Sequence, residues 1–408
     1  MSKKTIALID WNWMGHHPTY FTEFAAAMAR ADAEVVPFCA NPEDFNNRLS
    51  EMAENHALRN RICIAEHVNG PKPSKFRPAR WRGNYEAIRL FGGLGRQLRD
   101  WERQNNRKID LVFFACIYDW EFAHFSSSER FFGFPWTGLY LHARSLRMPG
   151  MASPYRTLIP RPEKVFGGRL LRSIALLDEG VIEKMRLITR SGNVFAFPDV
   201  ANESLPKEGA LNWGLAHKIK DFAAGRKIVT LVGYLQQTKG VEEFVELAKH
   251  PSMRNTIFFL GGEPGLDGFD EATKSRLQNA WEQTPNLWAH LQRLPEESLN
   301  AVVASSDVVF AAYRNFPNSS NIMTKAAMFE RPIVVSDGFL MAERVRHYCL
   351  GEVVPEGDVQ VLAYSVAKML EPNYINRLRS DARWADYKKD HSAASLEHAM
   401  KSLLAASV

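Results

Sequence analysis

The sequence predicts an α/β protein built from two doubly wound, Rossmann-like halves. Three observations lead to this fold class. The chain has 408 residues, which is too many for one compact core and favours two domains of ~150 to 200 residues. Short β-branched apolar runs alternate with stretches of helical hydrophobic spacing, a pattern typical of parallel βαβ units. Between the two series, residues 201–225 lose this regularity and are rich in polar and small residues.

The first half opens on a βαβ unit. Thr5–Ile9 is the first expected strand, and the helix after it carries Phe21, Phe24 and Met28 on one face. Pro18 suits the first turn of that helix. The connections in this half are long enough for parallel pairing. Its further expected strands are 34–38, 111–117, 137–141, 173–177 and 194–197.

The second half repeats the alternation and closes on polar helices between about 360 and 405. Its expected strands are 228–232, 256–260, 287–291, 308–312 and 333–335. We expect domains at 1–200 and 201–384. Doubly wound sheets bind ligands at the carboxyl ends of their strands, so the two halves are expected to face each other across a cleft. The loops of interest are 11–17, 118–124, 142–148, 233–240, 261–266 and 313–321.

Composition indicates an ordinary soluble, cytoplasmic protein. Hydrophobic residues make up 46% and charged residues 24% of the chain. The first apolar run reaches Asp10 after only five apolar-type positions, too few for a signal peptide core, and no later run approaches the length of a membrane span. The four cysteines are scattered without a CxxC pair and are expected to be buried, reduced thiols. No metal site is expected, because the adjacent His16 and His17 should diverge and no third ligand is apparent.

The segment 59–108 is unusually basic. It contains 13 Lys or Arg residues against 4 Asp or Glu, and it carries five large aromatic side chains. Such a segment is compatible with a solvated face over core aromatics, with an anionic acceptor, or with peripheral contact to the inner face of an anionic membrane. No nucleic-acid module accompanies it. The aromatic residues are Phe76, Trp81, Tyr85, Phe91 and Trp101.

Five stretches of the second half, in order and spacing, resemble the donor domain of family 4 type glycosyltransferases of the GT-B fold. They are "IVTLVGYLQQTKGVEEFVELA", "FFLGGEPG", "LQRLPEESLNAVVASSDVVFAAY", "ERPIVVSDGFLMAERV" and "LGEVVPEGD". The first half looks like the matching acceptor domain, with "FPDVANE" before the linker. The resemblance implies sugar transfer from a UDP- or GDP-linked donor to a glycan, lipid-linked or small-molecule acceptor. It also implies retention of stereochemistry, no protein-held metal, and a C-terminal helix of about 385–408 that returns to the first domain.

The expected donor site includes residues placed by the family resemblance and residues placed by their own chemistry. The resemblance places Lys239 against the departing diphosphate, where one preorganised cation can stabilise developing charge. The polar start of the helix in "NSSNIMTKAAM" can receive a phosphate on its backbone N–H groups. Lys325, one turn into that helix, can add charge. The donor- or phosphate-binding candidates are Gly15, His16, His17, Lys239, Gly262, Glu263, Arg293, Leu294, Ser319, Ser320, Asn321 and Lys325.

Three positions depart from the family pattern. Lys325 stands where a glutamate normally binds the ribose, and Pro317 where another glutamate normally meets the donor sugar. Tyr234 replaces a second cation. A lysine ammonium has only donors and cannot accept hydrogen bonds from ribose hydroxyls. The sequence therefore leaves a second hypothesis open, a catalytically inactive GT-B-like binding or assembly subunit.

Acceptor chemistry is expected at the strand ends of the first half. His142 follows a strand where the family has a histidine near the transferred sugar, so we expect it, with Lys239, to be catalytic. Arg144 beside it can meet an anionic group. Asp119 and Glu121 also follow a strand, where a carboxylate can orient or deprotonate an acceptor hydroxyl. The alternative for both carboxylates is a solvated loop end.

Overall fold

The chain forms two compact units. The computed structural model describes residues 3–52, 55–70, 79–122, 124–148, 165–207 and 209–408. Unit 1 contains the residues up to Val200 together with Ser392–Val408, and unit 2 is Ala201–His391. The expected division lay at residues 200/201 and near 385, so the returning C-terminal segment is shorter than the expected one.

Unit 1 is built on one seven-stranded sheet in which every pairing is parallel, as predicted. The strand order is β3-β2-β1-β4-β5-β6-β7. The short edge strand β3 was not expected. The strands are β1 (Thr5–Asp10), β2 (Glu34–Cys39), β3 (Glu66–His67), β4 (Leu111–Ile117), β5 (Trp136–Tyr140), β6 (Ile174–Leu176) and β7 (Val194–Ala196).

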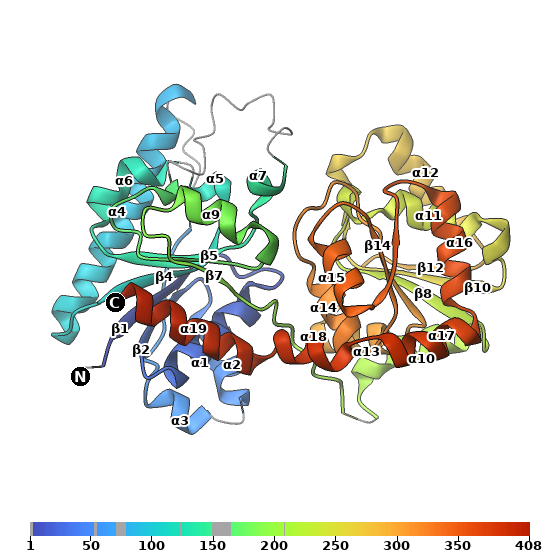
Figure 1. The fold of residues 1–408 in the computed structure, drawn as a ribbon, viewed down its shortest axis with the longest axis horizontal. Helices are drawn as coiled ribbons and strands as arrows, with labels where there is room; N and C mark the ends of the chain where they lie inside the picture. The colour runs from blue at the N-terminus through green and yellow to red at the C-terminus, as the bar shows by residue number, and fades with distance from the viewer. Residues whose placement is uncertain (1–2, 53–54, 71–78, 123, 149–164, 208) are drawn as a thin grey trace. The chain divides into compact units, whose positions relative to one another are not determined.

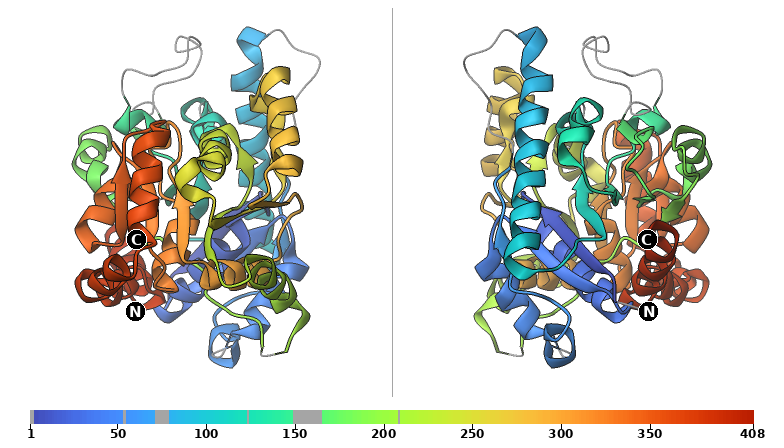
Figure 2. Two further views of the ribbon diagram at one scale, coloured as in Figure 1. Left: turned by 90° about the vertical axis from the view of Figure 1, so that its right-hand side faces the viewer. Right: turned by 90° about the vertical axis from the view of Figure 1, so that its left-hand side faces the viewer.

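Helices cover both faces of this sheet, because alternate strand residues point to opposite sides. Ile6 and Leu8 pack toward α1, α2, α3 and α19, whereas Ala7 and Ile9 pack toward α4, α6 and α9. Figure 1 shows the two layers, and Figure 2 shows the long α4 with α6 beside it. The helices are α1 (His17–Arg30), α2 (Pro42–Glu51), α3 (Asn55–Arg59), α4 (Ala79–Asn105), α5 (Asp119–Phe122), α6 (Phe125–Phe132), α7 (Arg144–Arg147), α9 (Ile182–Ile188) and α19 (Ala393–Ser407).

Unit 2 has a six-stranded parallel sheet of order β12-β10-β8-β13-β14-β15 and a small parallel pair, β11-β9. Strand β15 and the β9–β11 pair were not expected as strands. The strands are β8 (Lys227–Val232), β9 (Leu235–Gln236), β10 (Thr256–Gly261), β11 (Pro264–Gly265), β12 (Leu287–His290), β13 (Val308–Ala311), β14 (Ile333–Ser336) and β15 (Gly351–Val354).

The helices of unit 2 form one hydrophobic core with the sheet. The segment 201–225, expected to be irregular, contains α10, whose buried Ala216, Ile219 and Ala223 pack on that core. The helices are α10 (Gly214–Ala223), α11 (Val241–Lys249), α12 (Glu271–Gln283), α13 (Glu296–Ser305), α14 (Asn321–Met328), α15 (Leu340–Tyr348), α16 (Val359–Met369), α17 (Pro372–Asp381) and α18 (Trp384–Asp390).

Each sheet has one point at which the strand order reverses direction. In unit 1 this point lies between β1 and β4, and in unit 2 it lies between β8 and β13. Loops that leave the carboxyl ends of such neighbouring strands diverge to opposite faces, which opens a crevice for ligands. The loops after β1, β4, β8 and β13 are therefore the places to look for a site.

Candidate active site

Lys239 lies at the switch point of unit 2, at the end of the loop that follows β8. Its Nζ is 4.0 Å from the centre of the Tyr313 ring and 4.9 Å from that of Phe316, both in the loop after β13. An ammonium held over two aromatic faces is positioned by cation–π attraction without losing its charge. The next residue, Gly240, has φ +69°, and a Cβ there would lie 2.5 Å from the Ala312 carbonyl oxygen. Glycine therefore allows the two loops to come together.

The loop after β10 joins the same cluster. The Gly233 N–H donates to the Gly261 carbonyl, and the Leu235 N–H donates to that of Glu263. At Gly262, with φ +146°, a Cβ would lie only 1.7 Å from the Gly233 carbonyl oxygen. Gly262 is thus required for close packing between two loops, which the sequence alone could not distinguish from a simple tight turn.

Helix α14 begins beside this cluster, with Ser320 as its N-cap residue. The Ser320 Oγ lies 3.5 Å from the Tyr313 hydroxyl. Ser319 Oγ accepts a hydrogen bond of 2.8 Å from Nη1 of Arg344, a guanidinium on α15 that is only 2% exposed. The start of α14, including Asn321, therefore offers helix N–H groups next to two cations, Lys239 and Arg344. Sequence reasoning missed Arg344, which is 25 residues from Ser319 in the chain.

Lys325 is placed differently from the expectation. Its Nζ donates to the Asn202 carbonyl at 2.6 Å, to Asn300 Oδ1 at 2.7 Å and to Glu296 Oε1 at 3.2 Å. An ammonium has three N–H donors, so these acceptors use all of them. The side chain is 3% exposed, and burial lowers the pKa of Lys325, opposed by the Glu296 carboxylate. Lys325 connects α14, α13 and the start of unit 2, and we do not include it in the donor site.

The remaining donor candidates lie at the same edge of the sheet. Leu294 approaches the Gly261 turn, where its Cδ1 would be 3.2 Å from a Cβ on that glycine. Arg293 and Glu263 are exposed, so both side chains can reach a ligand from solvent. Pro317 is buried in the loop between β13 and α14.

The switch point of unit 1 holds a chain of hydrogen-bonded titratable groups. The Asp10 carboxylate ends β1, and its Oδ2 is 2.7 Å from Nδ1 of His17, the first residue of α1. Nε2 of His17 is 2.8 Å from the hydroxyl of Tyr118, which follows β4, and 3.1 Å from Nδ2 of Asn12. The backbone N–H of Asn12 and the Cys116 thiol also donate to Asp10. Burial raises the pKa of Asp10, opposed by the hydrogen bond and charge of His17.

Of the residues "GHH" predicted to meet a phosphate, His17 is 3% exposed and already hydrogen-bonded. Gly15 has φ +61° and open space around a built Cβ, so the turn needs glycine for its backbone conformation, not for close approach. The His16 ring stacks on that of His17, with centroids 4.9 Å apart and 18° between the planes. The expectation that these two rings diverge is therefore wrong.

His16, His17 and Cys116 bring three potential metal-ligand atoms within 4.8 Å of one another. The donor set is nevertheless already used, because His17 bonds to Asp10 and Tyr118. Burial, together with the nearby Asp10 and Glu121 carboxylates, raises the pKa of the Cys116 thiol well above its usual range. Since both ring nitrogens of His17 already have partners, we assign no metal to this group.

Two of the expected acceptor residues, His142 and Glu121, lie near Tyr118. The His142 ring is half-buried and meets the Tyr118 ring edge to face, with centroids 5.4 Å apart. Glu121 is half-buried on α5, and burial raises its pKa to about 7, opposed by a hydrogen bond from Trp11. Arg144 is exposed at the start of α7. The Asp119 side chain lies outside the described residues.

The basic segment 59–108 is dominated by α4. Phe91 and Trp101 belong to the core of unit 1, whereas Tyr85 is 38% exposed. Phe76 and the Trp81 side chain lie outside the described residues. No helix in the described part of the chain combines the length and apolar character that a membrane span needs. Peripheral membrane contact stays a prediction.

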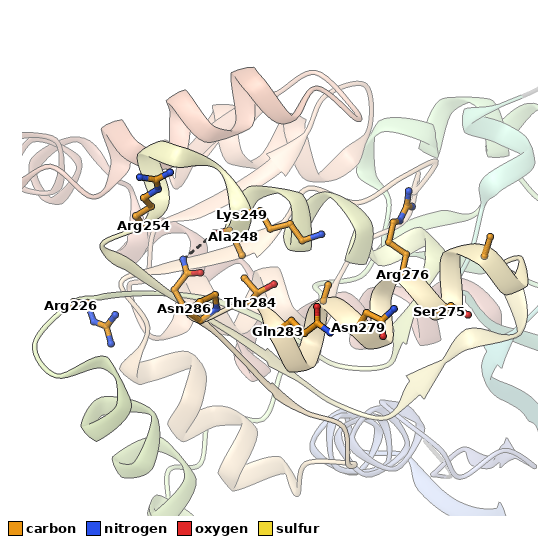
Figure 3. Close-up of a pocket in the computed structure, with 13 residues that line it drawn as sticks. Arg226, Ala248, Lys249, Arg254, Ser275, Arg276, Asn279, Gln283, Thr284 and Asn286 are labelled. Atoms are coloured by element: carbon orange, nitrogen blue, oxygen red, sulfur yellow. Dashed lines mark hydrogen bonds between the residues drawn. The ribbon is translucent and has the colours of Figure 1, made fainter.

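A basic hollow of about 950 Å³ lies on unit 2, away from the cluster formed by Lys239 and the start of α14 (Figure 3). Arg226, Arg254 and Asn286 lie just before β8, β10 and β12, at the amino-terminal edge of the sheet. Two of its other cations, Lys249 and Arg276, already pair with Glu246 and Glu242. Ligands of doubly wound sheets bind at the carboxyl edge, so we do not place the donor there.

The whole fold matches solved glycosyltransferase structures. HepE from Anabaena in complex with UDP-glucose superposes with a TM-score of 0.69 at 13% identity, covering 99% of this chain and 100% of HepE. Sucrose-phosphate synthase from Thermosynechococcus elongatus gives 0.64 at 16% identity, covering 99% and 100%. WaaG, a glycosyltransferase involved in lipopolysaccharide biosynthesis, gives 0.63 at 12% identity, covering 97% and 98%. The chain has the GT-B fold.

These structures confirm the predicted α/β fold class and the GT-B fold that the sequence motifs implied. No family model and no curated protein sequence matches the chain. At these identities the likeness concerns the fold. The chemistry must be argued from the two switch-point clusters themselves.

Proposed function

We propose that the chain is a glycosyltransferase that moves a sugar from a nucleotide-diphosphate donor to an acceptor, with the donor bound by unit 2 and the acceptor by unit 1. The observation that carries the proposal is the cluster at the switch point of unit 2. Lys239, the polar start of α14 and the Arg344–Ser319 pair converge there. This is an arrangement suited to an anionic diphosphate.

The donor is a UDP-linked sugar in this proposal. HepE, whose fold the chain shares over its full length, is described in complexes with UDP and with UDP-glucose. The Lys239 ammonium would stabilise the charge that develops on the departing diphosphate. No step requires a metal, since protein cations and helix N–H groups supply the countercharge. Retention at the anomeric carbon is part of the proposal on resemblance alone.

The test combines a panel of UDP, GDP and ADP sugars with product analysis by mass spectrometry and NMR. We expect UDP release coupled to transfer, insensitive to EDTA, with the anomeric configuration retained in the product. Absence of both transfer and donor hydrolysis across the panel would contradict an enzymatic function.

A catalytically inactive binding subunit is the competing function, and one observation favours it. Lys325 stands where the family has its ribose-binding glutamate, and its ammonium is fully used inside unit 2. Calorimetric titration with UDP separates the two functions. The transferase requires binding that weakens in Lys239→Ala, whereas no binding at millimolar UDP supports the inactive subunit.

A further inference from the structure

The basic hollow of unit 2 is elongated, because one of its walls is a whole face of α12. Residues of that helix line it at three- and four-residue spacing, namely Ala272, Ser275, Arg276, Asn279, Ala280 and Gln283. A helix rises about 1.5 Å per residue, so this wall is about 17 Å long. The hollow is therefore longer than a single sugar or phosphate group.

Positive charge is distributed along the hollow. Figure 3 shows Arg226 and Arg254 toward one end, Lys249 between the ends and Arg276 toward the other end. No aspartate or glutamate is among the described residues that line it. A cleft lined by one sign of charge concentrates ligands of the opposite sign. A ligand that uses all of this charge must carry anionic groups at intervals along its length.

The two arginines at one end have no acidic partner. The exposed Arg254 side chain makes no hydrogen bond or ion pair with any residue in the described part of the chain. Arg226 donates from Nε to the Ala223 carbonyl at 2.9 Å and from Nη2 to that of Phe222 at 3.0 Å. These bonds hold the Arg226 guanidinium at the end of α10 and leave its charge unbalanced. Arginine binds carboxylate, sulfate and phosphate groups in bidentate fashion.

The other two cations have acidic partners that a ligand can replace. Lys249 pairs with Glu246 at 3.2 Å, and Arg276 pairs with Glu242. Neither carboxylate lines the hollow, and both cation side chains are more than a third exposed. Ion pairs at the surface contribute little to stability. An anionic ligand therefore has only weak competitors for these cations.

The neutral part of the wall indicates what lies between the anionic groups of the ligand. Asn279 and Gln283 present exposed amides, and Ser275 adds a hydroxyl. Amides both donate and accept hydrogen bonds, as the hydroxyl groups of a sugar do. None of the described lining residues is aromatic, which argues against stacked nucleic-acid bases.

We propose that the hollow binds a linear acidic glycan, a sugar chain whose carboxylate, sulfate or phosphate groups recur along its length. The four cations bind the anionic groups, and Asn279 and Gln283 bind hydroxyls between them. The hollow lies at the amino-terminal edge of the sheet, so this site is separate from the donor cluster around Lys239. It goes beyond the proposed transferase function and does not require it.

The test is isothermal titration calorimetry of the full-length protein with tetragalacturonate, a linear chain with one carboxylate on each sugar. Maltotetraose, a neutral chain of the same length, and tetraglutamate, an acidic peptide, are titrated in parallel. We expect saturable binding of one tetragalacturonate per chain and much weaker binding of the other two. The Kd should be the same with and without saturating UDP, because the two sites are separate.

Variants locate the binding in the hollow. Arg254→Gln and Arg276→Gln should each weaken it ~10-fold, the scale of one charge-assisted hydrogen bond. Both side chains are exposed, so both variants should fold normally, which circular dichroism checks. Arg379→Gln is the matched control. It removes an exposed arginine of α17 that does not line the hollow, and it should keep the wild-type Kd.

The acidic partners give a test of opposite sign. Glu246→Gln and Glu242→Gln each release a cation of the hollow, so each should tighten binding about 3-fold, the scale of one surface ion pair. Glu282→Gln is the control for net charge. Glu282 is exposed on the same α12 but does not line the hollow, so its substitution should leave the Kd unchanged.

Three results would overturn the glycan site. They are absence of tetragalacturonate binding, binding that persists unchanged in Arg254→Gln and Arg276→Gln, and displacement of the probe by UDP. Tetraglutamate that binds as tightly as tetragalacturonate would overturn the assignment to a glycan in favour of an acidic peptide. Failure of UDP to bind, with tetragalacturonate binding intact, would contradict the proposed donor site and leave the glycan site supported.

Discussion

The carboxyl edges of the two sheets differ in chemistry although the sheets have the same kind of topology. In unit 1 the switch point holds buried groups that can exchange protons, namely Asp10, His17 and Tyr118. In unit 2 it holds fixed positive charge and helix N–H groups, with Lys239 over its aromatic rings. One edge is therefore suited to acid–base chemistry and the other to holding an anion. A sugar transfer from a diphosphate needs both.

Within unit 2, a second comparison separates Lys239, which we propose binds the donor, from Lys325, which the fold uses. Lys239 has aromatic neighbours and is partly exposed, whereas Lys325 is buried with three oxygen acceptors. Removing Lys325 should therefore lower stability, whereas removing Lys239 should lower turnover.

Removing the buried lysine should mainly reduce stability. Lys325→Met keeps the volume but leaves the Asn300 amide oxygen without its donor and the Glu296 carboxylate without its cation, so it should lower the free energy of unfolding by about 3 kcal/mol. Urea titration followed by tryptophan fluorescence measures this loss. Lys388→Met is the control, because Lys388 forms an exposed pair with Glu330 that contributes less than about 1 kcal/mol. A Lys325→Met protein of normal stability that no longer binds UDP would show that the lysine belongs to the site.

The next effect is on turnover. Lys239→Ala should lower kcat at least ~100-fold, the scale of removing one preorganised charge-stabilising group. The measurement is UDP release from saturating UDP-glucose, with stability checked by the same urea titration. The control is Lys249→Ala. It removes an exposed lysine from the far end of α11, the helix that follows Lys239, and should keep the wild-type rate. A near-normal rate in Lys239→Ala would refute its assigned role.

A smaller effect depends on pH and concerns unit 1. The pKa of Glu121 is raised by burial from 4.5 to about 7, so its ionisation destabilises the fold. This destabilisation by the ionised Glu121 is absent below about pH 4.5, grows as the pH rises and is complete above about pH 7. Glu121→Gln should therefore be about 2 kcal/mol more stable than wild type at pH 8, after discounting for partial exposure, and equal to it at pH 4. Thermal unfolding at both pH values tests the sign, and a pH-independent difference would contradict the raised pKa.

The smallest effect concerns the turn before His17. Gly15→Ala places a Cβ in a left-handed conformation and should cost about 1 kcal/mol, although no neighbouring atom is met. Gly15→Asn should cost less, because asparagine adopts this conformation more easily. Chemical denaturation of the two variants measures the difference. Equal losses would indicate that close contact, not backbone conformation, requires the glycine.

The fold could be predicted because the strands are continuous apolar runs with helices between them. Leu111–Ile117 was predicted to the residue, and the other expected strands lie within one or two residues of the observed ones. Strand β15 was missed because Gly351 and Glu352 interrupt its apolar pattern. Helix α10 was missed although Ala216, Ile219 and Ala223 lie at helical spacing, because the segment around it is rich in polar and small residues.

The site was only partly predictable. Lys239, Gly262 and the start of α14 were located by their register with known motifs, and the structure places them at one edge. Asp10 was seen only as the charge that ends an apolar run, and Tyr118 was not singled out. Strand order supplies the missing information, because β1 and β4 become neighbours only once the sheet is known. Lys325 was misjudged because its partners at 202 and 300 are distant in sequence.

Helix α19 has a consequence for how the protein is made. Its Leu396, Met400 and Leu403 are fully buried against α1 in the core of unit 1, and Ser407 bonds to Ser173 beside the sheet. The ribosome synthesises the strands of unit 1 before unit 2, and this helix only after all of unit 2. The first unit to emerge is therefore the last to be completed, and until then the apolar face of α1 lacks its cover and is a surface for a chaperone to protect.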